Sequence, residues 1–411
     1  MTTFVWVVLV FQVCLFVLWT CGLIWARGLN LDDDTRISPL PELPADAGSP
    51  SLAVVIAAHN EEARIKQCLG LLLQQNYGNF RIIVVDDRSD DETSPRVREI
   101  MARDPRVSLV EVEHLPEGWI GKTHALAVAT EQVDADYLLF IDCDCRIEPG
   151  AIAAVMRKVF DDGVAFASLW PSLELRSVSE RLLTPVAGWL LGLWAVMGTK
   201  RGAAKSEIRL GNGQFMLFSR EAYEKMGGHA SVQAELAEDL TMANKAAALG
   251  LKRWIGQGKE MYITTRNNSF TSTVDALTRV LIGSLVTPGR ILCSTQLVAG
   301  GVSSPLWALP IGLYAALALG MTAGWALVTA CLLHIAMMQA VVRHLFALTL
   351  RKRPSVLSFV AGSVVCTALL YRAWFIITGR GSVRWGKTTY RVRGSRVIDV
   401  LPDKGSSLTI P

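Results

Sequence analysis

The sequence predicts an α/β domain with a mostly parallel sheet, joined to transmembrane helices. From Ser51 to Ile141, short β-branched runs alternate with helical segments, a pattern typical of a parallel sheet covered on both faces. In addition, 51% of the 411 residues are hydrophobic and only 19% are charged. This composition excludes an intrinsically disordered chain and argues against a fully soluble one.

The first long apolar segment runs from Phe4 to Trp25 without a charge. At 1.5 Å per residue, its roughly 22 residues span the ~30 Å hydrocarbon core of a bilayer, so we expect a transmembrane helix. It lacks the basic start and the small-residue cleavage site of a signal peptide. Arg27 follows, and the positive-inside rule places the next segment in the cytosol.

Further apolar segments lie toward the C-terminus. About Leu297 to Val342 is long enough for two helices joined by a tight turn, and about Val356 to Ile377 is a third segment. A basic cluster follows each, and a single span between the clusters would put them on opposite sides of the membrane. We therefore expect one of these segments to be re-entrant or in-plane. The shorter segment Leu182 to Met197 is typical of an interfacial or buried helix.

Composition divides the chain into six parts. We expect an anchor (1–27), a proline-rich linker (28–50), the α/β domain (51–265), an interfacial segment (266–296), transmembrane segments (297–378) and a basic tail (379–411). The net charge of +4 is too small to indicate nucleic-acid binding, so the expected partner of the basic clusters is a membrane surface. The eight cysteines form no C-x-x-C pair, and we expect free thiols.

Strands and helices follow one another at short intervals in the α/β domain. We expect strands at Ser51–Ala57, Arg81–Val85, Val107–Val112 and Tyr137–Ile141, and helices at Glu61–Gln75, Glu92–Ala102, Lys122–Thr130 and about Ala237–Leu249. Such sheets bind ligands beyond the carboxyl ends of their strands, which is where the acidic residues of this chain collect.

Asp142 and Asp144 directly follow the last of these strands. Two carboxylates two residues apart can bind one hard cation together with the oxygens of a diphosphate, because Mg²⁺ and Mn²⁺ prefer oxygen ligands. A D-x-D alone is weak evidence, since acidic loops often contain it by chance. Its context strengthens it, because Asp86 and Asp87 close an earlier strand and His59 to Glu61 follows the first one.

Three further motifs lie near helix starts or turns. Gly118 to Lys122 supplies glycine flexibility, a helix N-terminus and a cation, all of which suit a diphosphate. Glu238 and Asp239 either complement the dipole of the helix they open or provide a general base for an acceptor hydroxyl. Gly211 to Gln214 is either a plain glycine turn or part of an acceptor pocket, while His229 is expected in a loop and not as a ligand.

The motif order A-A-H-N-E-E, V-V-D-D-R-S-D-D-E-T, G-K, D-C-D and E-D resembles the processive and lipid-modifying members of glycosyltransferase family 2. The resemblance covers about Ser51 to Trp254. With the tail motif R-W-G-K-T-T-Y-R at Arg384–Arg391, the anchors are similar to those of ceramide glucosyltransferases and of hopanoid- and carotenoid-associated glycosyltransferases. The resemblance implies a GT-A fold, an NDP-sugar donor (usually UDP-linked), Mg²⁺ or Mn²⁺, and inversion at the anomeric carbon.

The resemblance also implies residues for the nucleotide. Asp87, with Asp86 beside it, would hold the uracil, and Glu61 would lie near the nucleoside. Ala57 and His59 replace the usual proline and tyrosine of the first motif, a change that is tolerable because backbone groups make many of those contacts.

The resemblance also implies residues for the diphosphate, the sugar, the metal and the removal of the acceptor proton. Lys122 would lie near the diphosphate, Asp142 and Asp144 would bind the sugar and the metal, and Asp239, next to Glu238, would act as the base.

One signature of the family, Q/R-x-x-R-W after the base, is absent as such. The nearest candidate is Arg279 to Gly283, which keeps only the first basic residue. In processive polymer synthases the tryptophan of this signature helps to position the acceptor glycan. Its absence argues against the synthesis of a long polysaccharide.

The sequence therefore predicts a metal-dependent, inverting hexosyltransferase that moves one sugar from a UDP-sugar to a membrane lipid. We expect a multi-pass protein of the inner membrane with its α/β domain in the cytosol and no nucleic-acid partner. Two alternatives stay open: a short-chain synthase of a surface glycan, and a non-enzymatic scaffold that retains a nucleotide fold. The scaffold predicts loss of the acidic motifs, and all of them are present.

Overall fold

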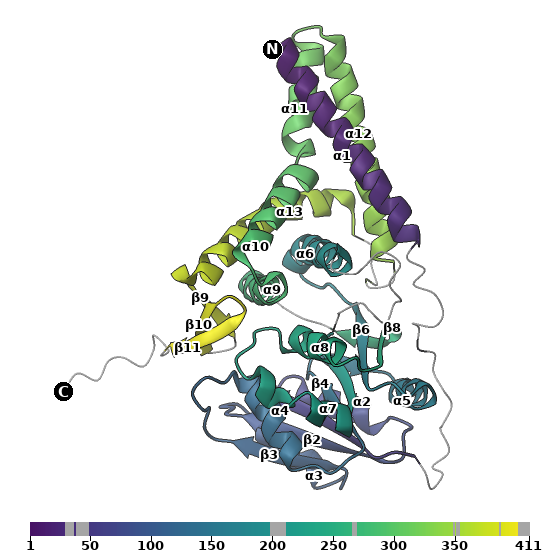
Figure 1. Cartoon of the computed structure of the whole chain (residues 1–411), viewed down its shortest axis with the longest axis vertical. Helices are drawn as coiled ribbons and strands as arrows, with labels where there is room; N and C mark the ends of the chain where they lie inside the picture. Colours follow the sequence, from purple (N-terminus) through teal and green to yellow (C-terminus); the bar gives the residue numbers. More distant parts are fainter. Residues whose placement is uncertain are drawn as a thin grey trace, which may run out of the picture.

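The structure is a computed structural model that describes residues 1–28, 37, 49–197, 211–264, 269–347, 350, 354–385 and 388–401. Most of the linker expected at 28–50 and residues 402–411 of the basic tail lie outside these ranges. Figure 1 shows an α/β body, a layer of helices above it and an upright helix bundle that ends at the N-terminus of the chain.

The α/β body begins with four strands that pair in parallel: β1 (Leu52–Ala58), β2 (Phe80–Asp87), β3 (Val107–Val112) and β4 (Tyr137–Ile141). Parallel neighbours need crossover connections, which contain α2 (Ile65–Leu73), α3 (Thr93–Met101) and α4 (Gly121–Glu131). The carboxyl ends of these strands consequently meet at one edge of the sheet.

The second half of the body completes an eight-stranded sheet within the described residues, in the order β3-β2-β1-β4-β7-β6-β8-β5. It adds β5 (Cys145–Ile147), α5 (Ala151–Asp162), β6 (Phe166–Leu173), β7 (Phe215–Ser219), α7 (Arg220–Lys225), the 3₁₀ helix η3 (His229–Val232), α8 (Glu238–Ala248) and β8 (Arg253–Thr264). Strand β7 is antiparallel to β4 and β6, whereas β6 and β8 are parallel. The predicted fold class, a mostly parallel GT-A sheet with membrane-type helices, is confirmed.

Apolar cores cover both faces of this sheet. On one face, Ile65 and Leu69 of α2 pack with the buried side chains of β1 and β2. On the other, Leu126 of α4 and Met242 of α8 pack against β1, β2, β4 and β7. The helices α4 and α8 therefore hold their N-termini at the carboxyl edge of the sheet.

One predicted helix begins later than expected. The interval Glu61–Gln75 was expected to be helical, but α2 starts at Ile65. Residues 61 and 62 form a turn because their amides donate to Thr93 Oγ1 (2.8 Å) and Asp91 Oδ2 (3.1 Å). The prediction was wrong at this end, and the turn keeps Glu61 at the edge of the sheet.

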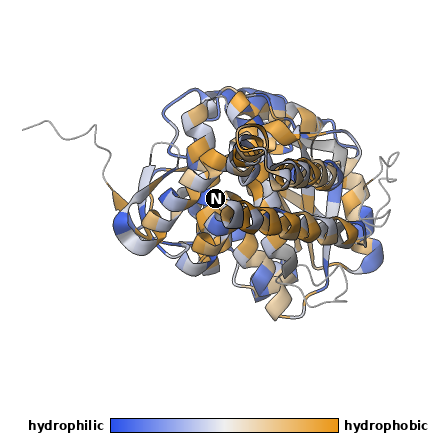
Figure 2. Ribbon diagram, turned by 90° about the horizontal axis from the view of Figure 1, so that it is seen from above, coloured by the Kyte–Doolittle hydropathy of each residue, from blue (hydrophilic) through white to orange (hydrophobic). Residues whose placement is uncertain are grey.

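The upright bundle consists of α1 (Thr2–Gly28), α11 (Pro305–Leu317) and α12 (Thr322–Leu345) (Figure 1). Small and branched side chains pack at its centre, among them Val8, Ala315 and Leu327. Seen from above, the bundle carries mostly hydrophobic residues (Figure 2). Among the described residues, four helical segments are long and apolar enough to cross a membrane: Thr2–Ile24, Pro288–Leu317, Thr322–Leu345 and Val356–Arg380.

Beneath the bundle lies a layer formed by α6 (Val178–Met197), α9 (Phe270–Leu285), α10 (Pro288–Gln296) and α13 (Val356–Phe375) (Figure 1). The π-helical segments η4 (Leu297–Val302) and η5 (Ile376–Arg380) continue α10 and α13. In Figure 1, α13 runs obliquely to the bundle. The segment predicted as an interfacial or buried helix is α6, whose Leu183 and Leu190 are buried in this layer.

A small antiparallel sheet follows α13 and consists of β9 (Ser382–Trp385), β10 (Thr388–Arg393) and β11 (Arg396–Leu401). We call residues 382–401 the tail sheet. Its Tyr390 and Val397 belong to the same apolar core as the helix layer, and so do Ile120 and Leu236 of the α/β body. The layer and the tail sheet are therefore packed onto the loops that precede α4 and α8.

Candidate active site

The carboxylates that the sequence singles out lie at the edge of the sheet where the parallel strands end. We call this edge, with Asp86, Asp87, Asp142 and Asp144, the carboxylate edge. Asp86 and Asp87 end β2, and the register pairs Ala58 at the end of β1 with Asp86. Asp142 and Asp144 follow β4, which neighbours β1 on its other side. This edge lies where the strand order reverses, and such switch points bind ligands in open α/β sheets.

Lys122, in the first turn of α4, is the central cation of the site. Its Nζ lies 2.8 Å from Asp142 Oδ1 and 2.9 Å from Glu238 Oε1, and it donates to the carbonyl oxygen of Gly213 at 3.4 Å. Burial alone would lower the pKa of Lys122, but the two carboxylates outweigh it and raise that pKa. The ammonium therefore stays charged beside the D-x-D motif.

The turn Gly211 to Gln214 links the D-x-D motif to the start of α8. Gln214 Nε2 donates to Asp144 Oδ1 at 2.9 Å, and the amide of Gly213 donates to Asp239 Oδ2 at 2.8 Å. A Cβ on Gly213 would lie 3.1 Å from Glu238 Oε1, so a larger residue would crowd the ion cluster. The turn therefore contacts three of the acidic side chains of the candidate site.

Glu238 and Asp239 are neighbours in sequence with different surroundings. Glu238 is only 4% exposed, and its carboxylate faces Lys122. Asp239 is half-buried, and both of its oxygens accept backbone N–H groups, from Gly213 and Leu240, each at 2.8 Å. Burial and the nearby charge of Glu238 raise the pKa of Asp239 to about 6. A carboxylate with such a pKa suits a general base near neutral pH.

Asp86 and Asp87 are both buried at the end of β2. Asp86 accepts the amide of Ser89 at 2.9 Å and the hydroxyl of Ser94, so it holds the loop that leads into α3. Asp87 accepts Nε and Nη2 of Arg88 at 2.8 and 3.0 Å. A Cβ on Gly121 would lie 2.1 Å from Asp87 Oδ2, so only glycine permits this approach of α4 to β2.

The first motif joins the same edge through side-chain contacts. His59 Nδ1 donates to the carbonyl oxygen of Asp87 at 2.6 Å, which ties the ends of β1 and β2 together. Ala57 lies opposite Val85 in the ladder between β1 and β2. Glu61 pairs with Arg64 at 3.0 Å. Burial raises the pKa of Glu61, and the nearby charges of Asp144 and Asp142 add to this rise.

Arg279 has its described partners in the tail sheet. Its guanidinium lies 5.1 Å from the centre of the Trp385 ring, and Nη1 donates to the carbonyl oxygen of Arg384 at 2.7 Å. An arginine on α9 therefore stacks on a tryptophan far along the chain. His229, expected in a loop and not as a ligand, is buried in η3, where its Nδ1 lies 2.8 Å from the Tyr223 hydroxyl.

Sequence reasoning missed two residues near the site. The phenol of Tyr390 lies near the amide of Gly121, and burial raises the pKa of this phenol. Glu235, three residues before Glu238, is 8% exposed and bonds to the tail sheet. The tail motif pointed to the Tyr390 region, but nothing in the sequence indicated that a segment about 160 residues away would contact Glu235.

The described residues contain no group of three or more His, Cys, Asp or Glu side chains that could hold a metal ion by themselves. Asp142 and Asp144 nevertheless fit a divalent cation, because Mg²⁺ sites commonly use one or two carboxylates plus substrate phosphates. Both side chains are partly exposed, and Glu61 adds a third acidic group nearby. The donor set therefore fits a cation that is completed by a diphosphate.

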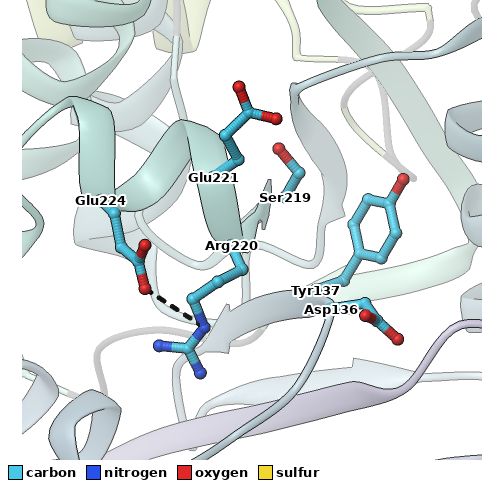
Figure 3. A pocket seen from close by; sticks show the side chains of 6 residues that line it. All are labelled: Asp136, Tyr137, Ser219, Arg220, Glu221 and Glu224. Atoms are coloured by element: carbon cyan, nitrogen blue, oxygen red, sulfur yellow. Dashed lines mark ion pairs between the residues drawn. The ribbon is translucent and has the colours of Figure 1, made fainter.

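A surface pocket lined by Asp136, Tyr137, Ser219, Arg220, Glu221 and Glu224 lies at the opposite end of β4 (Figure 3). Two of its charged residues, Asp136 and Arg220, bond to the surrounding strands and loops. Asp136 Oδ2 accepts the amide and hydroxyl of Ser51, both at 2.7 Å, and Arg220 donates to three backbone carbonyl oxygens. This pocket holds strand ends together and lies away from the carboxylate edge.

The fold and the carboxylate edge define a GT-A domain that carries candidate membrane helices. Residues 53–227 match the model of glycosyl transferase family 2. The chain is 26% identical over 215 residues to a 4,4'-diaponeurosporenoate glycosyltransferase of Staphylococcus haemolyticus, a match that covers 51% of this chain and 55% of the relative.

Two other similarities cover different shares of the chain. A hyaluronan synthase of Streptococcus pyogenes is 32% identical over 135 residues, which is 32% of either chain. The solved structure of a mannosyltransferase from Pyrobaculum calidifontis, in complex with GDP-Man and Mn²⁺, aligns with a TM-score of 0.47 at 17% identity and covers 82% of this chain and 99% of that one. The chain thus spans about half the length of the first curated relative and less of the hyaluronan synthase.

Proposed function

We propose that this protein is a membrane-bound, inverting glycosyltransferase that moves one hexose from a UDP-sugar to the hydroxyl of a membrane lipid. One observation carries the proposal. Asp239, whose pKa is raised to about 6, is held by the turn that also contacts Lys122 and Asp144, directly beneath a layer of apolar helices. A base, a cation and acidic metal ligands are thus within reach of one substrate.

The donor is proposed to bind along the carboxylate edge. Asp87, with Asp86 behind it, lies at the end of β2 for the uracil, and Glu61 lies between this end and the D-x-D motif. Lys122 supplies positive charge for the diphosphate at the N-terminus of α4, where backbone amides also favour anions. Asp142 and Asp144 are the residues that would hold Mg²⁺ or Mn²⁺, which when bound neutralises charge on the leaving diphosphate.

The transfer step follows from the position of the base. Asp239 removes the proton of the acceptor hydroxyl while the acceptor oxygen forms a bond to the anomeric carbon. The bond from that carbon to the diphosphate oxygen breaks, and UDP leaves on the opposite face. Displacement from opposite faces inverts the anomeric configuration. The two backbone N–H groups on Asp239 fix the direction of its carboxylate during this step.

A lipid acceptor is proposed because the base adjoins the helix layer. Gly283 of α9 lies so close to Ala237 that an added Cβ would be 2.6 Å from the alanine Cβ. Leu236 and Ile120, next to the base and to Lys122, belong to the apolar core of α6, α9 and α13. A lipid head group held at this layer reaches Asp239 without leaving the membrane surface. The similarity to a carotenoid-modifying glycosyltransferase agrees with such an acceptor.

The bundle is proposed to cross the inner membrane three times, with α13 in the plane of the membrane. The basic last turns of α1 (Arg27) and α12 (Arg343 and His344) then lie on the side of the α/β body. The positive-inside rule places that side in the cytosol. An in-plane α13 also keeps the tail sheet on the cytosolic side, where it contacts the α/β body.

The second candidate is a short-chain polysaccharide synthase. The 32% identity to a segment of hyaluronan synthase favours it. The missing Q/R-x-x-R-W signature speaks against it, although Arg279 and Trp385 stack at 5.1 Å from separate segments. The two functions differ in product, because a synthase lengthens a glycan whereas a lipid transferase adds one sugar.

The base can be tested with a pair of amide variants. Asp239→Asn should lower sugar transfer by about 10²–10⁴-fold while UDP-sugar binding is largely kept, because the donor contacts lie on other strands. Glu238→Gln should lower transfer less. Calorimetric binding of UDP-sugar beside transfer to lipid measures both effects. Equal, small losses in the two variants would mean that both acids only complement the dipole of α8.

A further inference from the structure

The segment from Gln233 to Ala237 connects Lys122 to the base. At its start, the carbonyl oxygen of Gln233 accepts the amide of Ile120 at 2.9 Å and the hydroxyl of Thr123 at 2.8 Å. Both of these residues flank the turn that carries Lys122. At its end, the segment runs directly into α8 with Glu238 and Asp239. Its position therefore sets the distance between the cation and the base.

The middle of this segment is bonded to the tail sheet as if it were an additional strand. The amide of Val397 donates to the carbonyl oxygen of Ala234 at 2.8 Å, and the amide of Leu236 donates to the carbonyl oxygen of Ser395 at 3.0 Å. Glu235 and Arg396 form an antiparallel bridge between the two bonds. Within the β10–β11 turn, Gly394 adopts a left-handed φ of 64°, which favours glycine.

Side chains reinforce this backbone pairing. Glu235 Oε1 accepts Arg396 Nε at 2.6 Å, and Glu235 Oε2 accepts the Ser395 hydroxyl at 2.8 Å. The Glu235 side chain is 10% exposed, whereas that of Arg396 is 71% exposed. Both oxygens of a nearly buried carboxylate are thus bonded to one turn of the tail sheet, and bonds of this charge-assisted type are stronger than neutral ones.

We propose that Glu235 is a positioning residue, which with Ser395 and Arg396 fixes the segment 233–237 so that Asp239 and Lys122 keep the spacing needed for sugar transfer. This inference rests on the proposed role of Asp239 as the base. Glu235 itself touches no substrate in the proposal. The tail sheet follows α13 and its continuation η5, so the contact also ties the in-plane helix to the base.

The test compares two arginines of the tail sheet. Arg396→Ala removes the partner of Glu235, and Arg391→Ala is the matched control because it breaks another ion pair of the tail sheet, with Asp399 at 3.5 Å. Each variant is purified as the full chain. Its kcat for sugar transfer, its donor KM and its UDP-sugar affinity by calorimetry are measured with Mn²⁺.

Arg396→Ala should lower kcat by about 10- to 100-fold, because small displacements of a catalytic group have effects of this size. Donor affinity should change by less than about twofold. Arg396→Lys should restore part of kcat, and Arg391→Ala should match the unaltered protein. Glu235→Gln combined with Arg396→Ala should lose little more than either single change, since both break the same contact.

Three results would overturn the proposal. The first is a kcat for Arg396→Ala equal to that of Arg391→Ala. The second is a loss of donor affinity as large as the loss of kcat, which would indicate that the change disturbs the whole site and not the base alone. The third is full additivity of the two single changes. Because Arg396 is largely exposed, its variant remains informative even where Glu235→Gln fails to fold. Asp239→Asn, measured in parallel, separates this inference from the proposed function, which fails if that variant retains transfer.

Discussion

At the scale of residues, the adjacent acids Glu238 and Asp239 have different surroundings because their partners differ. Glu238 is paired with Lys122, while Asp239 is oriented by two backbone amides. A sequence pattern cannot distinguish them, since both lie in the first turn of α8 and both suit its dipole. The difference arises from Gly213, whose amide reaches only one of them. Nothing local to the E-D motif encodes that contact.

The raised pKa of Asp239 predicts a pH dependence. A base must be ionised, so kcat/KM should fall about tenfold per pH unit below pH 6 and level off above it. In Glu238→Gln this acid limb should move to lower pH, because one cause of the raised pKa is removed. Initial rates of the unaltered protein and of Glu238→Gln, measured between about pH 4.5 and about pH 8, test both expectations. A flat profile across that range would remove Asp239 from the reaction.

The same shift has the opposite sign for stability. The folded protein binds the Asp239 proton more tightly than the unfolded chain does, since the folded-state pKa is the higher one. Its stabilising contribution is therefore complete at low pH and is lost as the pH rises through about 6. An ionised base at neutral pH lowers stability, which is a common feature of active sites.

Asp144 provides a second prediction at this scale. Asp144→Asn should abolish turnover because it removes a charge from the proposed metal site, while the partly exposed side chain adds little to the core. EDTA should reproduce the loss in the unaltered protein, and Mn²⁺ or Mg²⁺ should restore activity there. Near-normal transfer by the variant in metal-containing buffer would contradict the assignment. Its unfolding temperature serves as the control for folding.

At the scale of elements, close packing of α6 and α13 holds the helix layer together. A Cβ on Gly362 of α13 would lie 1.9 Å from the carbonyl oxygen of Leu182 in α6, whereas a Cβ on Gly192 of α6 would meet nothing within 4 Å. Gly362→Ala should therefore separate the helices and cost about 1–3 kcal/mol. Gly192→Ala is the matched control and should be neutral or stabilising, because alanine favours helix.

Thermal unfolding in detergent, together with sugar transfer, measures this pair of variants. The helix layer adjoins the proposed base through Gly283 and Ala237, so Gly362→Ala should reduce transfer as well as the unfolding temperature. If the two alanine variants had the same unfolding temperature and the same transfer activity, the close contact of α6 and α13 would not matter for either quantity. In that case the packing of the helix layer would not be needed to maintain the geometry of the proposed site.

The parallel half of the sheet could be predicted element by element, because its strands are short apolar runs bounded by polar turns. The expected strands Val107–Val112 and Tyr137–Ile141 coincide with β3 and β4. The start of α2 could not be predicted, since it depends on Thr93 and Asp91 from the neighbouring connection. Periodicity reports which face of an element is buried, but long-range hydrogen bonds decide where the element begins.

At the scale of the whole molecule, the carboxylate edge could be predicted from the sequence. The acidic motifs directly follow the predicted strands, and parallel strands bring those ends together at one edge of the sheet. The contacts of the tail sheet could not be predicted in this way. Glu235 and Arg396 are 161 residues apart, and no periodic pattern connects a tail to a loop at such a separation. The same holds for Arg279 and Trp385, whose stacking joins α9 to β9.

In the whole molecule, the proposed site lies where the α/β body meets the layer of apolar helices. The charged edge belongs to the sheet of the α/β body, and Leu236, three residues before Asp239, belongs to the apolar core of the helix layer. A single addition to a lipid then needs no channel for a growing chain. The central claim is therefore that the product is a membrane lipid carrying one added hexose.

Mass spectrometry of the lipid product tests this claim most directly. Purified protein in lipid vesicles is supplied with Mn²⁺, a panel of UDP-hexoses and membrane lipid extract, and UDP release is followed in parallel. The account predicts UDP release that depends on the extract, with one lipid species gaining the mass of a single hexose and Asp239→Asn giving neither signal. A ladder of products with increasing numbers of sugars, or UDP release without any glycosylated lipid, would contradict it.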